Sequence, residues 1–550
     1  MSLVHGLTKL RTRSLFPFKG CKRQPPLCTA STVFMAFCLL SLQPQQVYAI
    51  DFLDALNSSL KQINKSIPKP PGSVPHPNPA KPVPGHYPAN THQKRKIQYQ
   101  ITYEGYSKDF VPIRNLIASG DFKRAYQLEQ QNIKDNGIDF LNSVEAGLLS
   151  IDTKHTLDAV EDFASGETYL KQMMGRSIAE ESFTQYGLEA MSLISGKGDL
   201  VEYIGEPYER ILMLNYKSIA YLLNGERKAY NVTRRAIDWQ NIERKEFEKN
   251  IGEIKKQVKE NEKKPETEKA TSYAPEAFDL IFNQYKRYQS KAKSIPSAYI
   301  NPFGFYMAGI IQEFDSYEDA SLRGNARISY KKALELNPRS RVIKRAVRAT
   351  KRRPPRHKRL VHVIVADGFA PEKKTLSFTL NIGGGLVPIK SPLFEPVKSS
   401  VKTIKIKSGR KVLATLSPIA DIEAIILRNQ LDKLPIEQAR IMTSIARNIG
   451  ENLLWNQLGG FGVIGKLFRE SFANPDMRAW MTLPKKISAA RFYVSKRLKK
   501  ITIISYDRRG RRLAKKNVFL NRKSHNFIYA RSIEKAIYAQ VNKNLWIKKP

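Results

Sequence analysis

The sequence predicts an α+β protein of several domains, in which an N-terminal α-helical repeat array precedes a small β-sandwich-like domain with a helical insertion. Two observations lead to this class. Apolar residues recur at helical spacing over residues 97–350, whereas alternation with a period of two begins near Leu360 and continues to about residue 535. A chain of 550 residues with 41% hydrophobic residues is long enough for two or three folded domains.

Residues 1–49 have the features of a cleavable export signal. Basic residues precede the uncharged, mostly apolar run 30–42, and Val47-Tyr48-Ala49 follows as a cleavage site. The run is too short to span a bilayer, which takes about 20 residues. All three cysteines lie before Ala49, so the mature chain would lack disulfides and thiol chemistry. We therefore expect an exported, periplasmic protein that is not transmembrane.

A proline-rich linker is predicted over residues 50–96. Nine prolines lie between residues 67 and 90, and proline fixes φ and lacks an N–H, so this stretch is expected to be extended or disordered. It is either a spacer between a cell surface and the folded body or a passive tail, and the sequence leaves both open.

The helical region 97–350 contains a repeated helix–turn–helix pattern. Copies occur at residues 110–126, 219–230 and 305–338, and the third is the clearest. Small residues where helices cross, an aromatic residue in the next helix and a closing Asn-Pro are typical of tetratricopeptide repeats. Each hairpin leaves an apolar face that only a neighbouring hairpin can bury, so the pattern predicts a stacked array.

A basic linker, residues 351–359, is the predicted domain boundary. Eleven Lys or Arg and no acid occur between Arg339 and Arg359. Strands are predicted at 360–365, 375–380, 401–406, 500–506, 517–520 and 527–529, and a helical insertion at about 421–472. Residues 536–550 are predicted to form a basic tail.

The charge balance, 92 Lys+Arg against 50 Asp+Glu, favours an anionic partner. In an exported protein the available polyanions are anionic lipid, lipopolysaccharide and peptidoglycan, and nucleic acid is not expected. Residues 485–523 carry fifteen Lys or Arg and one acid, alternating with apolar residues, so one sheet face is expected to be positive while the other packs the core. A plain solvated face remains the alternative. The candidate anion-docking residues are Arg352, Arg353, Arg356, Lys358, Arg359, Lys499, Lys500, Arg508, Arg509, Arg511 and Arg512.

Five short motifs follow one another along the chain. They are Glu206-Pro207-Tyr208-Glu209-Arg210, followed by Leu212, Leu214 and Tyr216; Asn301-Pro302-Phe303; Glu335-Leu336-Asn337-Pro338; Asp367-Gly368-Phe369-Ala370-Pro371; and Asp476-Met477-Arg478-Ala479-Trp480 with Leu483 and Pro484. Together they resemble an uncharacterised family of bacterial tetratricopeptide-repeat lipoproteins. The resemblance implies a cell-envelope protein with no assigned reaction. The chain departs from this family at Ala36-Phe37-Cys38, where a bulky Phe stands in place of the small lipobox residue, so a lipid anchor is not expected.

Tyr208, Glu209 and Arg210 are the candidate recognition residues. In one interpretation Glu209 and Arg210 line the concave groove of the array and recognise a partner. In the other they pair with neighbouring helices and hold the stack together.

The sequence contains no HExxH or GxSxG motif and no His-x-Glu constellation, so we expect no catalytic site, metal or cofactor. The function expected from the sequence is a non-enzymatic periplasmic scaffold or adaptor. Its tetratricopeptide-like groove would bind a protein partner of the cell envelope, and its basic β-domain face would dock on anionic envelope material. The alternative is a cell-wall hydrolase with an unrecognised site in the β domain.

Overall fold

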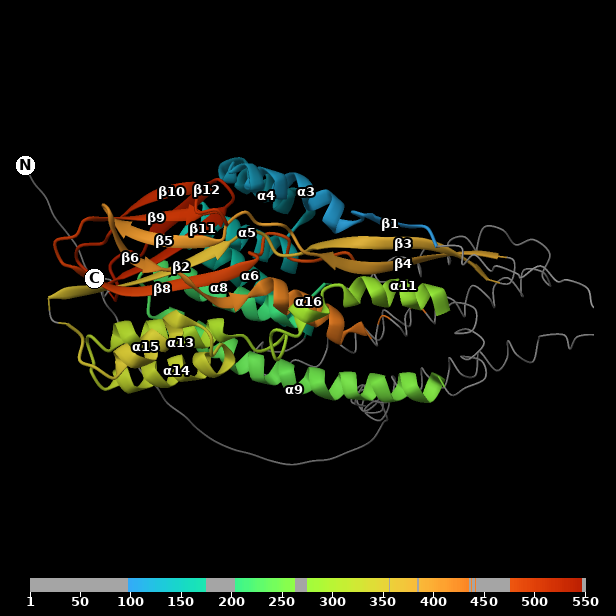
Figure 1. Cartoon of the computed structure of the whole chain (residues 1–550), viewed down its shortest axis with the longest axis horizontal. Coiled ribbons are helices and arrows are strands. Elements are labelled where there is room, and N and C mark those ends of the chain that lie inside the picture. The colour runs from blue at the N-terminus through green and yellow to red at the C-terminus, as the bar shows by residue number, and fades with distance from the viewer. Residues whose placement is uncertain are drawn as a thin grey trace, which may run out of the picture. The chain divides into compact units, whose positions relative to one another are not determined.

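The computed structural model of this chain describes residues 97–174, 203–262, 275–355, 357–382, 385–434 and 475–546, together with residues 437 and 441. All of them lie in one compact unit, Ser59–Pro550. The predicted export signal and proline-rich linker lie outside the described residues, as does most of the predicted helical insertion. The described part of the chain is an α+β fold (Figure 1).

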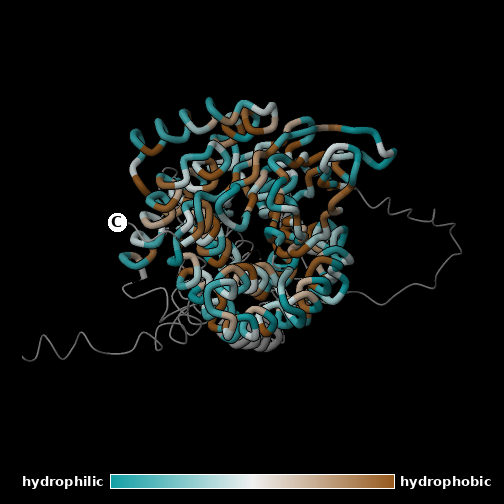
Figure 2. Tube along the Cα trace, turned by 90° about the vertical axis from the view of Figure 1, so that its left-hand side faces the viewer, coloured by the Kyte–Doolittle hydropathy of each residue, from teal (hydrophilic) through white to brown (hydrophobic). Residues whose placement is uncertain are grey.

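The described helices lie before residue 351, with the exception of α16. They are α3 (Tyr106–Ser119), α4 (Phe122–Asn136), α5 (Phe140–Asp152), α6 (Thr156–Met174), α8 (Pro207–Leu223), α9 (Lys228–Glu262), α11 (Pro275–Lys286), α12 (Gln289–Ala292), α13 (Pro302–Asp315), α14 (Leu322–Leu336), α15 (Arg341–Thr350) and α16 (Ile422–Asp432). Hydrophobic and hydrophilic residues alternate around the helical coils in Figure 2, as amphipathic helices require.

The three predicted hairpins are confirmed as the helix pairs α3–α4, α8–α9 and α13–α14, whose members pack against each other. Local signals set their ends. Gly120 closes α3 in the left-handed conformation, at φ 89°, and the Asp121 carboxylate accepts a hydrogen bond from the N–H of Arg124 (3.1 Å) to open α4. Asn301 is the N-cap of α13, and Pro302 is the first residue of that helix.

The strands form three sheets. The five-stranded sheet has the order β12-β11-β2-β8-β7, the four-stranded sheet β10-β9-β5-β6 and the three-stranded sheet β1-β3-β4. Among the described strands, every pairing is antiparallel except the parallel pair β11–β2. The strands are β1 (Tyr99–Thr102), β2 (Lys358–Asp367), β3 (Glu372–Ile382), β4 (Gly385–Glu395), β5 (Thr403–Ser408), β6 (Lys411–Thr415), β7 (Ser417–Asp421), β8 (Lys486–Ser495), β9 (Lys500–Tyr506), β10 (Arg512–Phe519), β11 (Asn526–Ile533) and β12 (Ala536–Val541).

All six predicted strands are present, as β2, β3, β5, β9, β10 and β11. Two predicted ranges are corrected at their edges. Tyr99–Thr102 is not helical but forms β1, which pairs with β3. The predicted tail also begins too early, because Ala536–Val541 is strand β12 on the edge of the five-stranded sheet, and Trp546 packs against the core.

The five-stranded sheet is buried on both faces. On β2, Leu360 and Ile364 belong to the hydrophobic cluster shared with the helices, whereas Val361 and Val363 belong to a second cluster shared with the four-stranded sheet. A strand covered on both faces needs a continuous apolar run, which β2 has. The helices and the two facing sheets therefore form three successive layers.

The predicted boundary at 351–359 does not separate two hydrophobic cores. One cluster contains residues of α5, α6, α8, α9 and α12 to α15 together with residues of β2, β8 and β11. Lys358 and Arg359, expected in the linker, are the first two residues of β2. The composition changes at this point, but the core is continuous across it.

Replacing Gly309 with alanine is expected to destabilise the protein by about 1–3 kcal/mol. A Cβ at Gly309 in α13 would lie 2.4 Å from Cε1 of Tyr330 in α14, and Tyr330 is fully buried and has no room to move. Gly324→Ala is the matched control, because a Cβ there meets no atom within 4 Å and alanine favours a helix. In urea unfolding, Gly309→Ala should lower the free energy of unfolding and Gly324→Ala should raise it. Equal unfolding midpoints for the two variants would contradict the tight crossing of α13 and α14.

Candidate functional site

The predicted recognition residues Tyr208, Glu209 and Arg210 lie in the first turn of α8 and are at most 1% exposed. The Arg210 guanidinium forms a fully buried ion pair with Glu243 of α9, with Nε 3.1 Å from Oε1. Glu209 accepts hydrogen bonds from the N–H of Trp480 (2.9 Å) and from the hydroxyl of Tyr203 (2.6 Å). These three side chains do not line an open groove. Arg210 pairs with a neighbouring helix, as the second interpretation of the motif predicted, whereas Glu209 is held by Tyr203 and Trp480, which lie outside the described helices.

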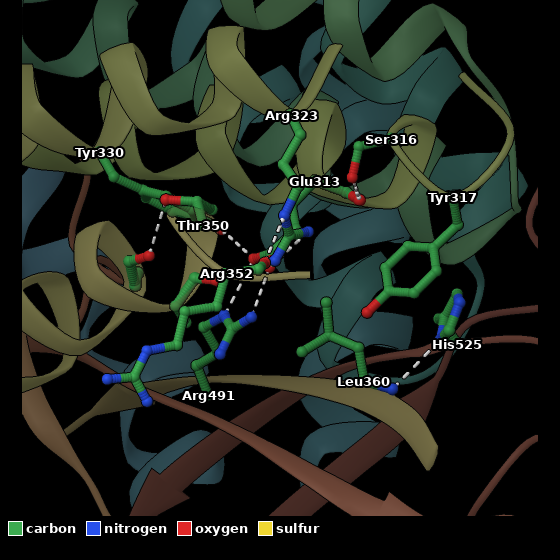
Figure 3. A network of polar contacts seen from close by, with 12 residues as sticks. Glu313, Ser316, Tyr317, Arg323, Tyr330, Thr350, Arg352, Leu360, Arg491 and His525 are labelled. Atoms are coloured by element: carbon green, nitrogen blue, oxygen red, sulfur yellow. Dashed lines mark hydrogen bonds and ion pairs between the residues drawn. The ribbon is translucent and has the colours of Figure 1, made fainter. Parts of the chain in front are cut away.

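A second buried carboxylate, Glu313 of α13, joins the helices to the five-stranded sheet (Figure 3). Its Oε2 accepts hydrogen bonds from Nε of Arg491 in β8 (2.9 Å) and from the hydroxyl of Tyr330 in α14 (3.0 Å), and lies 3.2 Å from Nε2 of His362 in β2. Burial alone would raise the pKa of Glu313, but Arg491 and His362 outweigh it and hold the pKa well below its usual value. We call Glu313, Arg491, His362 and Tyr330 the Glu313 cluster.

The Glu313 cluster has the residue types of a catalytic centre but not the access. The side chains of Glu313 and His362 are fully buried, and that of Arg491 is 4% exposed. A carboxylate already held by an arginine and a tyrosine is a poor general base. The cluster is therefore best described as a polar link between layers.

The candidate anion-docking residues are mostly at the surface. Arg359 is the exception, since its guanidinium is buried and donates to the backbone carbonyls of Asn521 and Leu498. Arg356 lies outside the described residues. The exposed members are Arg352, Arg353, Lys358, Lys499, Lys500, Arg508, Arg509, Arg511 and Arg512.

The structure does not bring all of these residues together. Lys499 and Lys500 lie where β9 begins, and Lys358 lies beside the adjoining end of β8. The four arginines between residues 508 and 512 lie around the turn at the other end of β9, about 20 Å away for a seven-residue strand. One of the four, Arg511, is paired with Asp507.

Lysines that were not among the candidates connect these two groups. Lys405 of β5 and Lys515 of β10 both lie opposite Ile504 of β9, on the sheet face that points away from the second hydrophobic cluster. Lys405 and Lys407 also approach the Tyr506 ring, with Nζ atoms 5.3 and 6.0 Å from its centroid. The alternation of lysine and isoleucine in β5 is the sequence signal for this face.

We call this surface the outer basic face. Its cations are Lys405, Lys407, Lys500, Arg512 and Lys515, and its aromatic residues are Tyr506 and Phe519. None of the five cations forms an ion pair with a described acid, and strands β5, β6, β9 and β10 contain seven Lys or Arg and no Asp or Glu. Phe519, opposite Lys500, is 70% exposed. The face is thus positive and not neutralised from within the described chain.

No family model, curated protein or solved structure matches this chain. Among the described residues, no helix combines the length and apolar character needed to cross a membrane. The same part of the chain contains no group of three or more His, Cys, Asp or Glu residues placed to hold a metal ion.

His525, which lies beside the Glu313 cluster (Figure 3), makes stability depend on pH. Its Nδ1 accepts the N–H of Leu360 (3.1 Å), and burial lowers its pKa to about 4. Because the unfolded residue titrates near 6.5, stability is full above that pH and falls as the pH drops towards 4. Asn in place of His525 keeps a hydrogen-bond acceptor but does not titrate. Between pH 7 and pH 4.5, the free energy of unfolding in urea should therefore fall by about 2 kcal/mol more for the native chain than for His525→Asn. Parallel pH profiles for the two proteins would contradict a neutral, half-buried His525.

Proposed function

We propose that this protein is an exported, non-enzymatic adaptor of the cell envelope that docks on anionic envelope material through the outer basic face. The observation that carries the proposal is the set of five unpaired cations on one sheet face whose four strands contain no acid. An anionic surface supplies the counter-charge that this face lacks, at a favourable free energy of about 1 kcal/mol per basic residue.

The residue types on the face favour a broad anionic surface over one specific ligand. Lysine is a compact, hydrated charge that attracts anions without the fixed geometry of arginine, and four of the five cations are lysines. The exposed Phe519 beside Lys500 adds an apolar group of the kind that enters a headgroup layer. Anionic lipid and lipopolysaccharide therefore fit better than peptidoglycan, and the expected export signal is the argument against nucleic acid.

We further propose that the helix pairs are degenerate tetratricopeptide-like units and that the two facing sheets are a β-sandwich, as in the lipoprotein family that the sequence resembles. The close contact of Gly309 with Tyr330 is the small-residue crossing that such repeats use. Because the chain's own five-stranded sheet covers one side of the helices, a protein partner in the envelope would bind the side that points away from the sheet.

The proposal is tested by co-sedimentation of the purified protein with vesicles containing phosphatidylglycerol. Lys405→Gln/Lys500→Gln/Lys515→Gln should weaken binding by about 100-fold at low salt, and 0.5 M salt should weaken binding of the native protein similarly. The control Lys123→Gln/Lys134→Gln/Lys331→Gln removes the same charge from exposed helix positions and should change binding by less than about threefold.

Equal losses for the two triple variants would show that net charge, and not the outer basic face, drives docking. A parallel incubation with peptidoglycan tests the absence of enzymatic activity. Release of soluble muropeptides would overturn the adaptor proposal in favour of a wall hydrolase.

A further inference from the structure

A cavity of about 500 Å³ lies where α15 begins, between that helix, the β6–β7 corner and β8. Four arginines line it, Arg339, Arg341, Arg345 and Arg491, and no acid does. None of the five cations of the outer basic face is among its lining residues. The cavity is therefore a second concentration of positive charge, with a concave shape that the sheet face lacks.

The three arginines of the α15 side carry charges that the described structure leaves unneutralised. Arg339, Arg341 and Arg345 are exposed, and their side chains make no ion pair or hydrogen bond with a described residue. Arg341 and Arg345 are four residues apart, so they lie on the same side of the helix. Like charges placed together repel one another unless an anion binds between them.

Arg491 and Ser417 give the cavity fixed polar walls. The Arg491 side chain is 4% exposed and is held by Glu313, so its position is set by the buried cluster behind it. The Ser417 hydroxyl accepts the N–H of Arg341 (3.1 Å) at the first turn of α15, and the Ser340 side chain makes no capping bond there. The positive end of the helix dipole thus adds to the arginine charges.

The remaining walls and the size of the cavity narrow the ligand class. Val342, Leu416 and Pro418 supply an apolar side. Cavities of roughly 300–1,000 Å³ bury small organic ligands, and the guanidinium fork matches the oxygens of a phosphate. We propose that this cavity binds a small phosphate monoester whose organic part lies against the apolar side. This inference does not depend on the proposed envelope docking.

Calorimetric titration of the full chain with phenyl phosphate tests the inference. Arg341→Gln/Arg345→Gln should raise Kd at least about tenfold, because each lost arginine removes a charge-assisted hydrogen bond. Lys344→Gln/Arg348→Gln removes the same charge from exposed positions of the same helix that do not line the cavity, and Kd should change by less than about twofold. All four side chains are exposed, so both variants should keep the native unfolding midpoint.

Two further arms identify the charged group and its source. Phenyl phosphate should bind more weakly at pH 5 than at pH 7.5, since the phosphate loses its second charge near pH 6. Vesicles of phosphatidic acid carry the same monoester as a lipid headgroup. If these vesicles retain the native chain but not Arg341→Gln/Arg345→Gln, the natural ligand is a lipid headgroup. If the native chain binds phenyl phosphate but the vesicles retain both proteins equally, the natural ligand is a soluble phosphate monoester. No binding in either arm, or equal Kd values for the two double variants, would overturn the proposal.

Discussion

The charge of Glu313 is the constraint on which the arrangement of helices and strands depends. A buried carboxylate is costly unless it is paired, and its partners come from three elements: Arg491 of β8, His362 of β2, and Tyr330 and Arg323 of α14. Asp152 of α5 repeats the arrangement, with its carboxylate hydrogen-bonded by the hydroxyl of Tyr529 in β11 (3.1 Å) and close to the Arg531 guanidinium. At both sites an acid from a helix thus lies against an arginine from the five-stranded sheet, so these contacts join the two layers.

This internal pairing also shapes the outer surface. Among the described residues, eleven Asp or Glu are buried, but only six Lys or Arg are. The fold withdraws more negative than positive charge from solvent, so the surface is more basic than composition alone indicates. The outer basic face and the arginine-lined cavity are two places where basic side chains gather. The first is a sheet face of mostly lysine, which suits an extended anionic surface, and the second is concave and arginine-lined, which suits a discrete phosphate.

Local patterns in the sequence predicted the three helix hairpins and six of the twelve described strands, whereas the relations between the elements needed the structure. The alternation in β9 and the hairpin at residues 110–126 depend only on neighbouring residues, and both were predicted correctly. The burial of Glu209 depends on Trp480, 271 positions away, so the residue types alone left open whether this motif faces solvent. The shared core across residues 351–359 was missed for the same reason, because a change in composition does not reveal which faces are buried together. On the outer face, Lys405 and Lys515 become neighbours only through strand pairing with β9.

We conclude that the helices and the five-stranded sheet form one folding unit held by the Glu313 cluster. Hydrogen exchange of the native chain and of Glu313→Gln, followed by mass spectrometry, tests it most directly. We expect the opening free energies of α13 and of the pair β2–β8 to fall together, by about 3 kcal/mol, because the buried Arg491 guanidinium loses its counter-charge. Loss of protection confined to α13–α14, with β2 and β8 unchanged, would show that the sheet is stable without the helices and would contradict the claim.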